Sequence, residues 1–284
     1  MENLKEIIQE NFQKERRNNI TFLTGAGLSA ASGIPTYRST DGIWVKGTKY
    51  HKPEEFGTFS YFSKNQEEVW QFKLFMTNMF DNAQPNDSHK LLTKIEAQVP
   101  EKFSIITQNV DGLHLRAGNS PENVYEIHGN SRTMRCSLEC SKEIYELPED
   151  ILIEKIDQDL TDADWDKLEC PKCDAVMRPN ILWFDEYYNE RLYKIDSTMR
   201  IAKKTGILIV IGTSGATTLP LELVKQTLKY GGYVLDINLE DNNITKLIEG
   251  KKRAVSYRTT SDVFLSEFYE LLQQNIINKL PNTK

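Results

Sequence analysis

Short apolar runs recur along the chain, and each ends in small or polar residues. The runs are Ile20–Leu23, Phe103–Ile106, Val124–Ile127, Ile207–Ile211 and Tyr233–Ile237. Runs of this length are typical of strands that are buried on both faces, as they are in a parallel sheet. The pattern therefore predicts an α/β fold with a doubly wound, Rossmann-like parallel sheet. Its ligand is expected beyond the carboxyl ends of the strands.

Segments with helical periodicity separate the apolar runs. Helices are predicted over residues 2–17, 88–98, 190–203, 220–230 and 261–275. Two segments break the alternation, because residues 45–83 carry an aromatic-rich helical run and residues 134–177 carry all four cysteines. The predicted division is a large, Rossmann-like sheet domain of residues 1–45, 84–133 and 178–284 with a small lobe of residues 46–83 and 134–177.

Length and charge restrict the functional class. The 284 residues suit one large domain or one domain with a small insertion, and 39% hydrophobic content is enough for a packed core. A net charge of −6 argues against direct nucleic-acid binding. No apolar stretch is long enough for a membrane span, and the N-terminus lacks a signal-peptide core. We expect a soluble, cytoplasmic protein; its oligomeric state is not predicted.

The cysteines form two closely spaced pairs, Cys136/Cys140 and Cys170/Cys173. Disulfides would be expected in a secreted chain, whereas two short-spaced pairs in an intracellular one are typical of a four-thiolate zinc site. Four protein ligands leave no open position, so the ion would be structural. The segment 146–169 between the pairs holds ten acidic residues. It is predicted as a solvated face or as a docking surface for basic partners.

A glycine-rich segment, residues 25–38, directly follows the first apolar run. Gly25, Gly27 and Ala30 fit the G-x-G-x-x-G/A pattern, in which glycines let the backbone approach a pyrophosphate at a helix N-terminus. Packing alone can also require such a turn. The acidic residue that dehydrogenases carry about 20 positions further on has no counterpart. The segment therefore predicts a dinucleotide site without hydride transfer.

Several longer motifs follow the other predicted strands, at residues 107–114, 126–129, 178–184 and 212–214. With the glycine segment, they resemble the sirtuins, the family of NAD-dependent protein deacylases, from about residue 22 to residue 270. The resemblance implies a Rossmann-like NAD-binding domain, a zinc-binding lobe, NAD as co-substrate, one structural Zn²⁺ and an acyl-lysine protein as substrate. It also implies release of nicotinamide.

His128 is the histidine that ends a predicted strand and precedes a glycine, and an imidazole is a natural general base near neutral pH. In sirtuins the matching histidine deprotonates the nicotinamide ribose hydroxyl, after the acyl oxygen has displaced nicotinamide from C1′. The resemblance assigns Asn109 and Asp111 to catalysis beside it, with Asp111 holding the nicotinamide carboxamide. Loop-stabilising turns are the alternative for these two residues. His51, His89 and His114 are predicted to be structural.

The resemblance also assigns a nucleotide-binding set. Arg38 would meet the pyrophosphate, Tyr37 would shield the reacting ribose, and Asn238 would lie at the adenosine ribose. The full set is Gly25, Ala26, Gly27, Ser29, Tyr37, Arg38, Gln108, Asn109, Asp111, Gly212, Thr213, Ser214 and Asn238.

For the substrate, the resemblance implies that residues 181–186 pair with a peptide and that Leu182 and Phe184 line an acyl-lysine tunnel. Asp185 stands where sirtuins commonly have glycine, and Thr36 stands where they have aspartate. Sirtuins that remove succinyl or malonyl groups resemble one another in a Tyr-x-x-Arg pair that clamps the acidic acyl group. Lys73 and Met76 occupy its two places here, so a neutral acyl group is expected. The predicted activity is deacylation, most simply deacetylation. Protein ADP-ribosyl transfer, NAD hydrolysis and a non-enzymatic NAD-sensing module are the alternatives.

Overall fold

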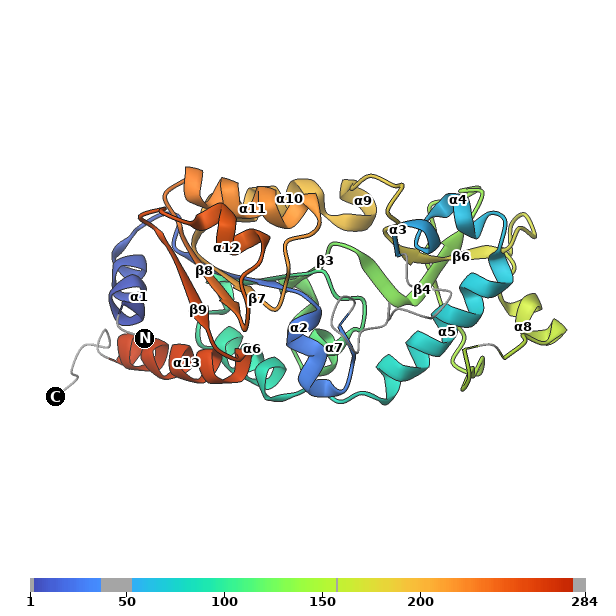
Figure 1. Cartoon of the computed structure of the whole chain (residues 1–284), viewed down its shortest axis with the longest axis horizontal. Helices are drawn as coiled ribbons and strands as arrows, with labels where there is room; N and C mark the ends of the chain where they lie inside the picture. Colours follow the sequence, from blue (N-terminus) through green and yellow to red (C-terminus); the bar gives the residue numbers. More distant parts are fainter. Residues whose placement is uncertain (1–2, 37–52, 157, 278–284) are drawn as a thin grey trace.

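The large sheet has six parallel strands in the computed structural model, which describes residues 3–36, 53–156 and 158–277 (Figure 1). Its order is β3-β2-β1-β7-β8-β9. The strands are β1 (Asn19–Thr24), β2 (Phe103–Thr107), β3 (Val124–Glu126), β7 (Thr205–Ile211), β8 (Tyr233–Asn238) and β9 (Ala254–Arg258). All five predicted strands are confirmed. β9 is not among the predicted strands, because this edge strand mixes apolar and polar residues and none of them is fully buried.

Helices cover both faces of this sheet. Side chains of β7 alternate between two apolar clusters, with Ile207 and Ile209 on one face and Leu208 and Val210 on the other. The first face packs against α1 (Leu4–Gln13), α6 (Asp87–Gln98) and α13 (Ser261–Ile277). The second packs against α10 (Ile195–Lys204), α11 (Thr218–Lys229) and α12 (Asn243–Ile248). The doubly wound prediction is therefore confirmed (Figure 1).

Two predicted helices are wrong in their extent. The helix predicted over residues 2–17 ends at Gln13, because the Lys14 backbone that follows is extended. Residues 190–203 form two helices, α9 (Glu190–Tyr193) and α10, because Lys194 between them has a left-handed backbone with φ of 54°. None of the described helices is long and apolar enough to span a membrane. The remaining short elements of the large part are α2 (Ala26–Ser29), η1 (Ala30–Ser32), η2 (Pro100–Lys102), α7 (Leu113–Arg116) and η3 (Pro121–Asn123).

The strand order reverses between β1 and β7, where the turn after β1 touches the turn after β7. The amide of Gly27 donates to the carbonyl oxygen of Gly212 at 2.9 Å. A Cβ atom on Gly27 would lie 2.7 Å from the Gly212 Cα atom, closer than real Cβ atoms come. The glycines thus serve close packing at the switch point. In doubly wound folds a ligand binds there, in the crevice beyond the carboxyl ends of the strands.

A second, antiparallel sheet lies toward the other end of the molecule (Figure 1). Its order is β5-β4-β6, and its own apolar cluster includes Trp70, whose indole N–H donates to the Met177 carbonyl at 2.9 Å. The elements are α3 (Pro53–Phe56), α4 (Phe59–Phe62), α5 (Gln66–Asn82), β4 (Gly129–Cys136), β5 (Tyr145–Glu146), α8 (Asp162–Lys167) and β6 (Met177–Ile181).

Gly129 begins β4 at the point where the chain leaves the large sheet. Its φ is 87°, and a Cβ atom there would lie 2.0 Å from the carbonyl oxygen of Asn180 in β6. The paired antiparallel strands β4 and β6 therefore lie with their backbones in close contact at Gly129, where the chain enters the small sheet.

We expect Gly129→Ala to cost far more stability than Gly231→Ala. Both glycines have φ of 80° or more, so both substitutions carry the left-handed cost of about 1–2 kcal/mol. Gly231 has no atom within 4 Å of an added Cβ, whereas Gly129 would collide with backbone, which adds roughly 1–3 kcal/mol or more. Urea unfolding of both variants measures the difference. Equal losses of unfolding free energy in the two variants would contradict the close backbone contact at Gly129.

Candidate functional site

Polar side chains that follow β1 and β2 form one network beside the glycine turn. The Asn109 amide nitrogen donates to the Gly25 carbonyl at 3.1 Å and to the Ser29 hydroxyl at 3.0 Å. The Ser29 hydroxyl donates to Asp111 at 2.7 Å, and the Leu113 amide donates to the other carboxylate oxygen at 2.9 Å. Burial raises the pKa of Asp111 despite these donors. The network brings together four residues of the predicted nucleotide-binding set.

Gln108 joins this network to the end of β7. Its side-chain nitrogen donates to the Thr213 hydroxyl at 2.9 Å and to the Thr24 carbonyl at 3.3 Å. The Ser214 carbonyl accepts from the amide of Asn243, so the loop after β7 is held from α12 as well. Residues 212–214 thus lie across the switch point from residues 25–29.

His128 follows β3 and has a partner on each ring nitrogen. Its Nδ1 lies 3.0 Å from the Gln108 carbonyl oxygen, and its Nε2 lies 2.8 Å from the Tyr188 hydroxyl. A carbonyl only accepts, so Nδ1 carries the proton and Nε2 presents its lone pair. Burial lowers the pKa of His128 to about 4, against a smaller raising effect of the Gln108 carbonyl. The ring is therefore neutral at pH 7.

Sequence reasoning missed Tyr188, since its segment offers only an aromatic residue between polar ones. It also missed Glu126, two residues before His128. Burial raises the pKa of Glu126 to about 7; a hydrogen bond from Asn130 lowers it, and the charge of Asp111 raises it further. The fold brings Tyr188 to His128, and it buries Glu126 within reach of the Asp111 charge.

Two other histidines are buried as a pair away from this crevice. The rings of His89 and His114 lie 5.1 Å apart between centroids, and His114 Nε2 meets the Thr24 hydroxyl at 3.0 Å. Burial lowers both pKa values, that of His89 to about 4. Their surroundings agree with the predicted structural role. His51 lies outside the described residues.

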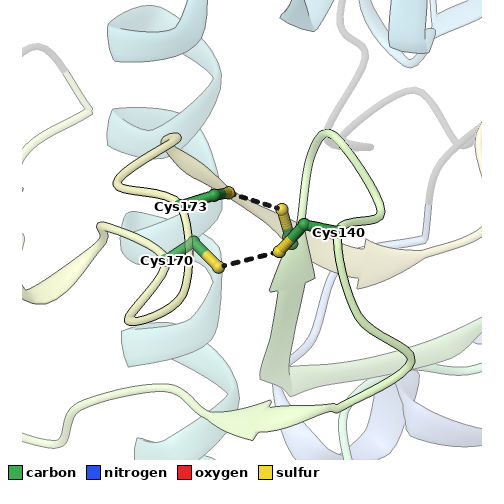
Figure 2. Close-up of side chains that lie close together, drawn as sticks. Cys140, Cys170 and Cys173 are labelled. Atoms are coloured by element: carbon green, nitrogen blue, oxygen red, sulfur yellow. Dashed lines mark hydrogen bonds between the residues drawn. The ribbon is translucent and has the colours of Figure 1, made fainter.

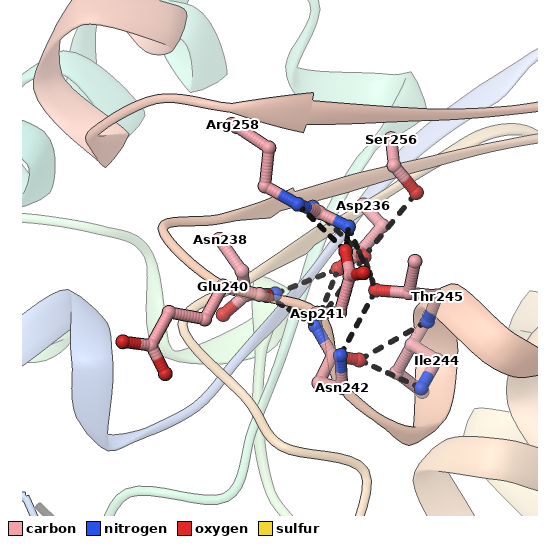
Figure 3. Close-up of polar contacts among 9 residues, drawn as sticks. All are labelled: Asp236, Asn238, Glu240, Asp241, Asn242, Ile244, Thr245, Ser256 and Arg258. Atoms are coloured by element: carbon pink, nitrogen blue, oxygen red, sulfur yellow. Dashed lines mark hydrogen bonds and ion pairs between the residues drawn. The ribbon is translucent and has the colours of Figure 1, made fainter.

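Asn238 ends β8 beside a buried carboxylate, Asp236 (Figure 3). The Asn238 amide nitrogen donates to Asp236 at 2.6 Å, and the Thr245 hydroxyl donates to the same carboxylate at 2.7 Å. Arg258 lies 3.6 Å from it as an ion pair. The bond to Asp236 fixes the orientation of the Asn238 amide. Its oxygen remains to accept a hydrogen bond from a ligand hydroxyl.

The predicted substrate segment begins next to the base. The Leu182 amide donates to the His128 carbonyl at 2.9 Å, so Leu182 lies beside the histidine. The Phe184 side chain is 52% exposed, which leaves an apolar surface on this segment. Asp185 accepts from the amides of Phe59 and Ser60 at 2.7 and 3.0 Å. Its carboxylate therefore caps α4, and these bonds engage both of its oxygens.

An ion-pair cluster holds the segment in place. The Glu186 carboxylate binds Arg178 through two bonds, of 2.5 and 2.8 Å, and Arg135 through a third of 3.3 Å. The Arg178 side chain is almost fully buried and lies over the ring of Trp183. A two-pronged carboxylate–guanidinium pair fixes orientation as well as distance, so it fixes how the chain leaves β6.

The four cysteine sulfurs come together from two turns, one after β4 and one before β6 (Figure 2). All four lie within 4.8 Å of one another, with Cys136–Cys173 at 3.6 Å and Cys140–Cys170 at 3.5 Å. A disulfide would need about 2 Å. Sulfurs bound tetrahedrally to one zinc at about 2.3 Å lie about 3.8 Å apart. The donor set and spacing fit one structural zinc ion.

The acidic segment 146–169 packs apolar side chains inward, although Leu152 is exposed. Ile151, Ile153 and Leu160 are buried in the same cluster as α5, while α8 begins with a capping box of Thr161 and Asp164. The packing agrees with the predicted solvated face on a small module.

Two of the predicted nucleotide-binding residues, Tyr37 and Arg38, lie outside the described residues.

Comparisons with known proteins agree with this geometry. The model of the Sir2 family matches residues 25–218. A NAD-dependent protein deacylase of Aquifex aeolicus (strain VF5) is 36% identical over 265 residues, 92% of this chain and 98% of that protein.

Two solved structures are similar over nearly the whole chain. A Sir2 homolog–NAD complex has a TM-score of 0.76 at 30% identity and covers 96% of this chain and 94% of its own. A mutant Sir2 homologue with 2′-O-acetyl ADP ribose has a TM-score of 0.78 at 30% identity and covers 99% of both chains.

We expect acid to destabilise the protein through its buried histidines. His89 has a pKa of about 4 when folded and about 6.5 when unfolded, so below pH 6.5 the unfolded chain binds the proton more readily. The stability it contributes is complete above pH 6.5 and is lost as pH falls toward 4, by about 2 kcal/mol at pH 5. Urea unfolding at pH 7.5 and 5 measures the loss. His89→Gln should show a shallower dependence; an identical slope would contradict it.

We expect metal analysis to give one zinc per chain and Cys170→Ser to lose it. Structural zinc in small modules contributes on the order of 10 kcal/mol, so the melting temperature should fall as well. Ser141→Ala, next to Cys140, is the matched control and should keep both the metal and the melting temperature. Metal-free protein with an unchanged melting temperature would contradict the site.

Proposed function

The chain belongs to the Sir2 family, and we propose on that premise that it removes acyl groups from protein lysines with NAD as co-substrate, most simply as a deacetylase. The resemblance to sirtuins is thereby confirmed. The relative from Aquifex carries the name NAD-dependent protein deacylase, and one similar structure holds 2′-O-acetyl ADP ribose, an acyl group carried on ADP-ribose.

The state of His128 is the observation that carries the proposal. A general base must be unprotonated at working pH and must present its lone pair toward the crevice. The Gln108 carbonyl holds the proton on Nδ1, and burial keeps the ring neutral. His128 also adjoins Leu182 through the backbone, so the base and the proposed acyl-lysine segment lie together.

Each remaining group has a supporting task. When bound, NAD would supply an electrophilic ribose carbon and the hydroxyl that takes the acyl group. His128 would accept the proton of a ribose hydroxyl. Asn109 and Ser29 order the polar floor beside the glycine turn, and Asp111 would present its carboxylate to the nicotinamide carboxamide. A zinc ion held by the four cysteines would stabilise the small lobe and take no part in the reaction. We propose that the chain divides into an NAD-binding domain and a small lobe close to the predicted boundaries, which fall inside β4 and β6.

The acyl group is proposed to be neutral. Met76 is buried in the small-lobe cluster and offers no charge. Lys73 lies on the same helix, α5, and burial lowers its pKa to about 8, which weakens it as a clamp for a carboxylate. The site around α5 therefore favours an acetyl or other uncharged acyl group over an acidic one.

Incubation with NAD and an acetyl-lysine peptide tests the activity, with products identified by mass. We expect nicotinamide, deacetylated peptide and O-acetyl-ADP-ribose. His128→Ala should lower turnover by about 10²–10⁴-fold, because it removes the general base, while NAD binding persists.

The same assay separates the alternatives. ADP-ribosylated protein would indicate ADP-ribosyl transfer, and free ADP-ribose without need of peptide would indicate NAD hydrolysis. Binding of NAD without any product would indicate a sensing module. Near-full turnover by His128→Ala would overturn its assignment as base.

A further inference from the structure

Tyr188 lies in the segment between β6 and α9 and reaches back to the end of β3. Its hydroxyl is 2.8 Å from His128 Nε2, and the two rings lie 5.9 Å apart at 33°. The rings of Tyr188 and Tyr193 pack edge to face, with their centroids 6.4 Å apart. The Tyr188 hydroxyl also has a hydrogen bond with the Thr217 side chain. Contacts from three elements thus hold this side chain against the base.

The direction of the bond to His128 follows from the other ring nitrogen. Nδ1 faces the Gln108 carbonyl, which can only accept, so the neutral ring carries its proton there. Nε2 then has one lone pair in the ring plane and no proton. The Tyr188 hydroxyl must donate to it. Burial raises the pKa of Tyr188 to about 12, so the hydroxyl keeps its proton at neutral pH.

One lone pair accepts one strong hydrogen bond at a time. The lone pair that Tyr188 occupies is the same one that would take the proton of a ribose hydroxyl. We propose that Tyr188 is a positioning residue that caps the base: it occupies Nε2 of His128 while the crevice is free of nucleotide and must release it before the reaction. This inference rests on the proposed function.

The cap has two consequences. It holds the imidazole in one tautomer and orientation before the nucleotide enters, so the base is preorganised. Nucleotide binding must also break the hydrogen bond between Tyr188 and His128. The observed affinity for NAD is therefore weaker by the net free energy of that bond. A net value typical of protein hydrogen bonds corresponds to a change of about 2- to 10-fold in an equilibrium constant.

Tyr188→Phe removes the hydroxyl and keeps the ring. The matched control is Tyr193→Phe, which removes a hydroxyl that donates to the Ile181 carbonyl at 3.1 Å and makes no contact with His128. In the 284-residue chain, the ¹⁵N resonance of His128 Nε2 is recorded without nucleotide, and the dissociation constant of NAD is measured by calorimetry.

We expect the Nε2 resonance to move downfield in Tyr188→Phe alone, and NAD to bind about 2- to 10-fold more tightly to that variant alone. An unmoved resonance, unchanged affinity or weaker binding would overturn the cap. Neither measurement needs turnover, and the resonance needs no nucleotide. A chain that fails to deacylate would therefore refute the proposed function and leave the result on Tyr188 standing.

Discussion

The close approach of two glycine turns at the switch point is the constraint on which the site depends. Gly27 donates its amide to Gly212, and neither position has room for a side chain against the other. This contact sets the spacing of the two loops that border the crevice. Asn109 bonds to Gly25 and Ser29 on the first side and Gln108 bonds to Thr213 on the second, so the polar floor takes its geometry from a contact between backbones.

Burial lowers the pKa of three histidines alike, and their places in the fold decide which of them can act as a base. His89, His114 and His128 all have lowered pKa values, and desolvation is the largest cause for each. The first two face each other inside the large part of the fold, where their protonation only costs stability. His128 lies where the chain leaves β3, with a carbonyl on one nitrogen and a hydroxyl on the other. The same physical effect therefore gives structural residues in one place and a base in another.

The small lobe acts on the site through the strands that join it to the large sheet. β4 begins directly after His128, and β6 leads into the segment of Leu182 and Tyr188. The Arg178–Glu186 pair orients that segment, and Asp185 caps α4, so the segment is fixed from both sides. The cysteine cluster closes the far end of β4 and the approach to β6. A structural ion there stabilises the strands that place the base and its neighbours, without touching the crevice.

The sequence by itself determined the sheet, the clustering of the cysteines and the family. Buried parallel strands must be continuously apolar, and paired thiolates need short spacing, so both leave a local pattern. Tertiary structure alone decided the rest. Tyr188 meets His128 across 60 residues of chain, and Asp185 turns out to be a helix cap. Burial also decided that His128 and His89 are neutral. These are relations between distant segments, and no local spacing encodes them, because desolvation and hydrogen-bond partners depend on what the fold packs alongside.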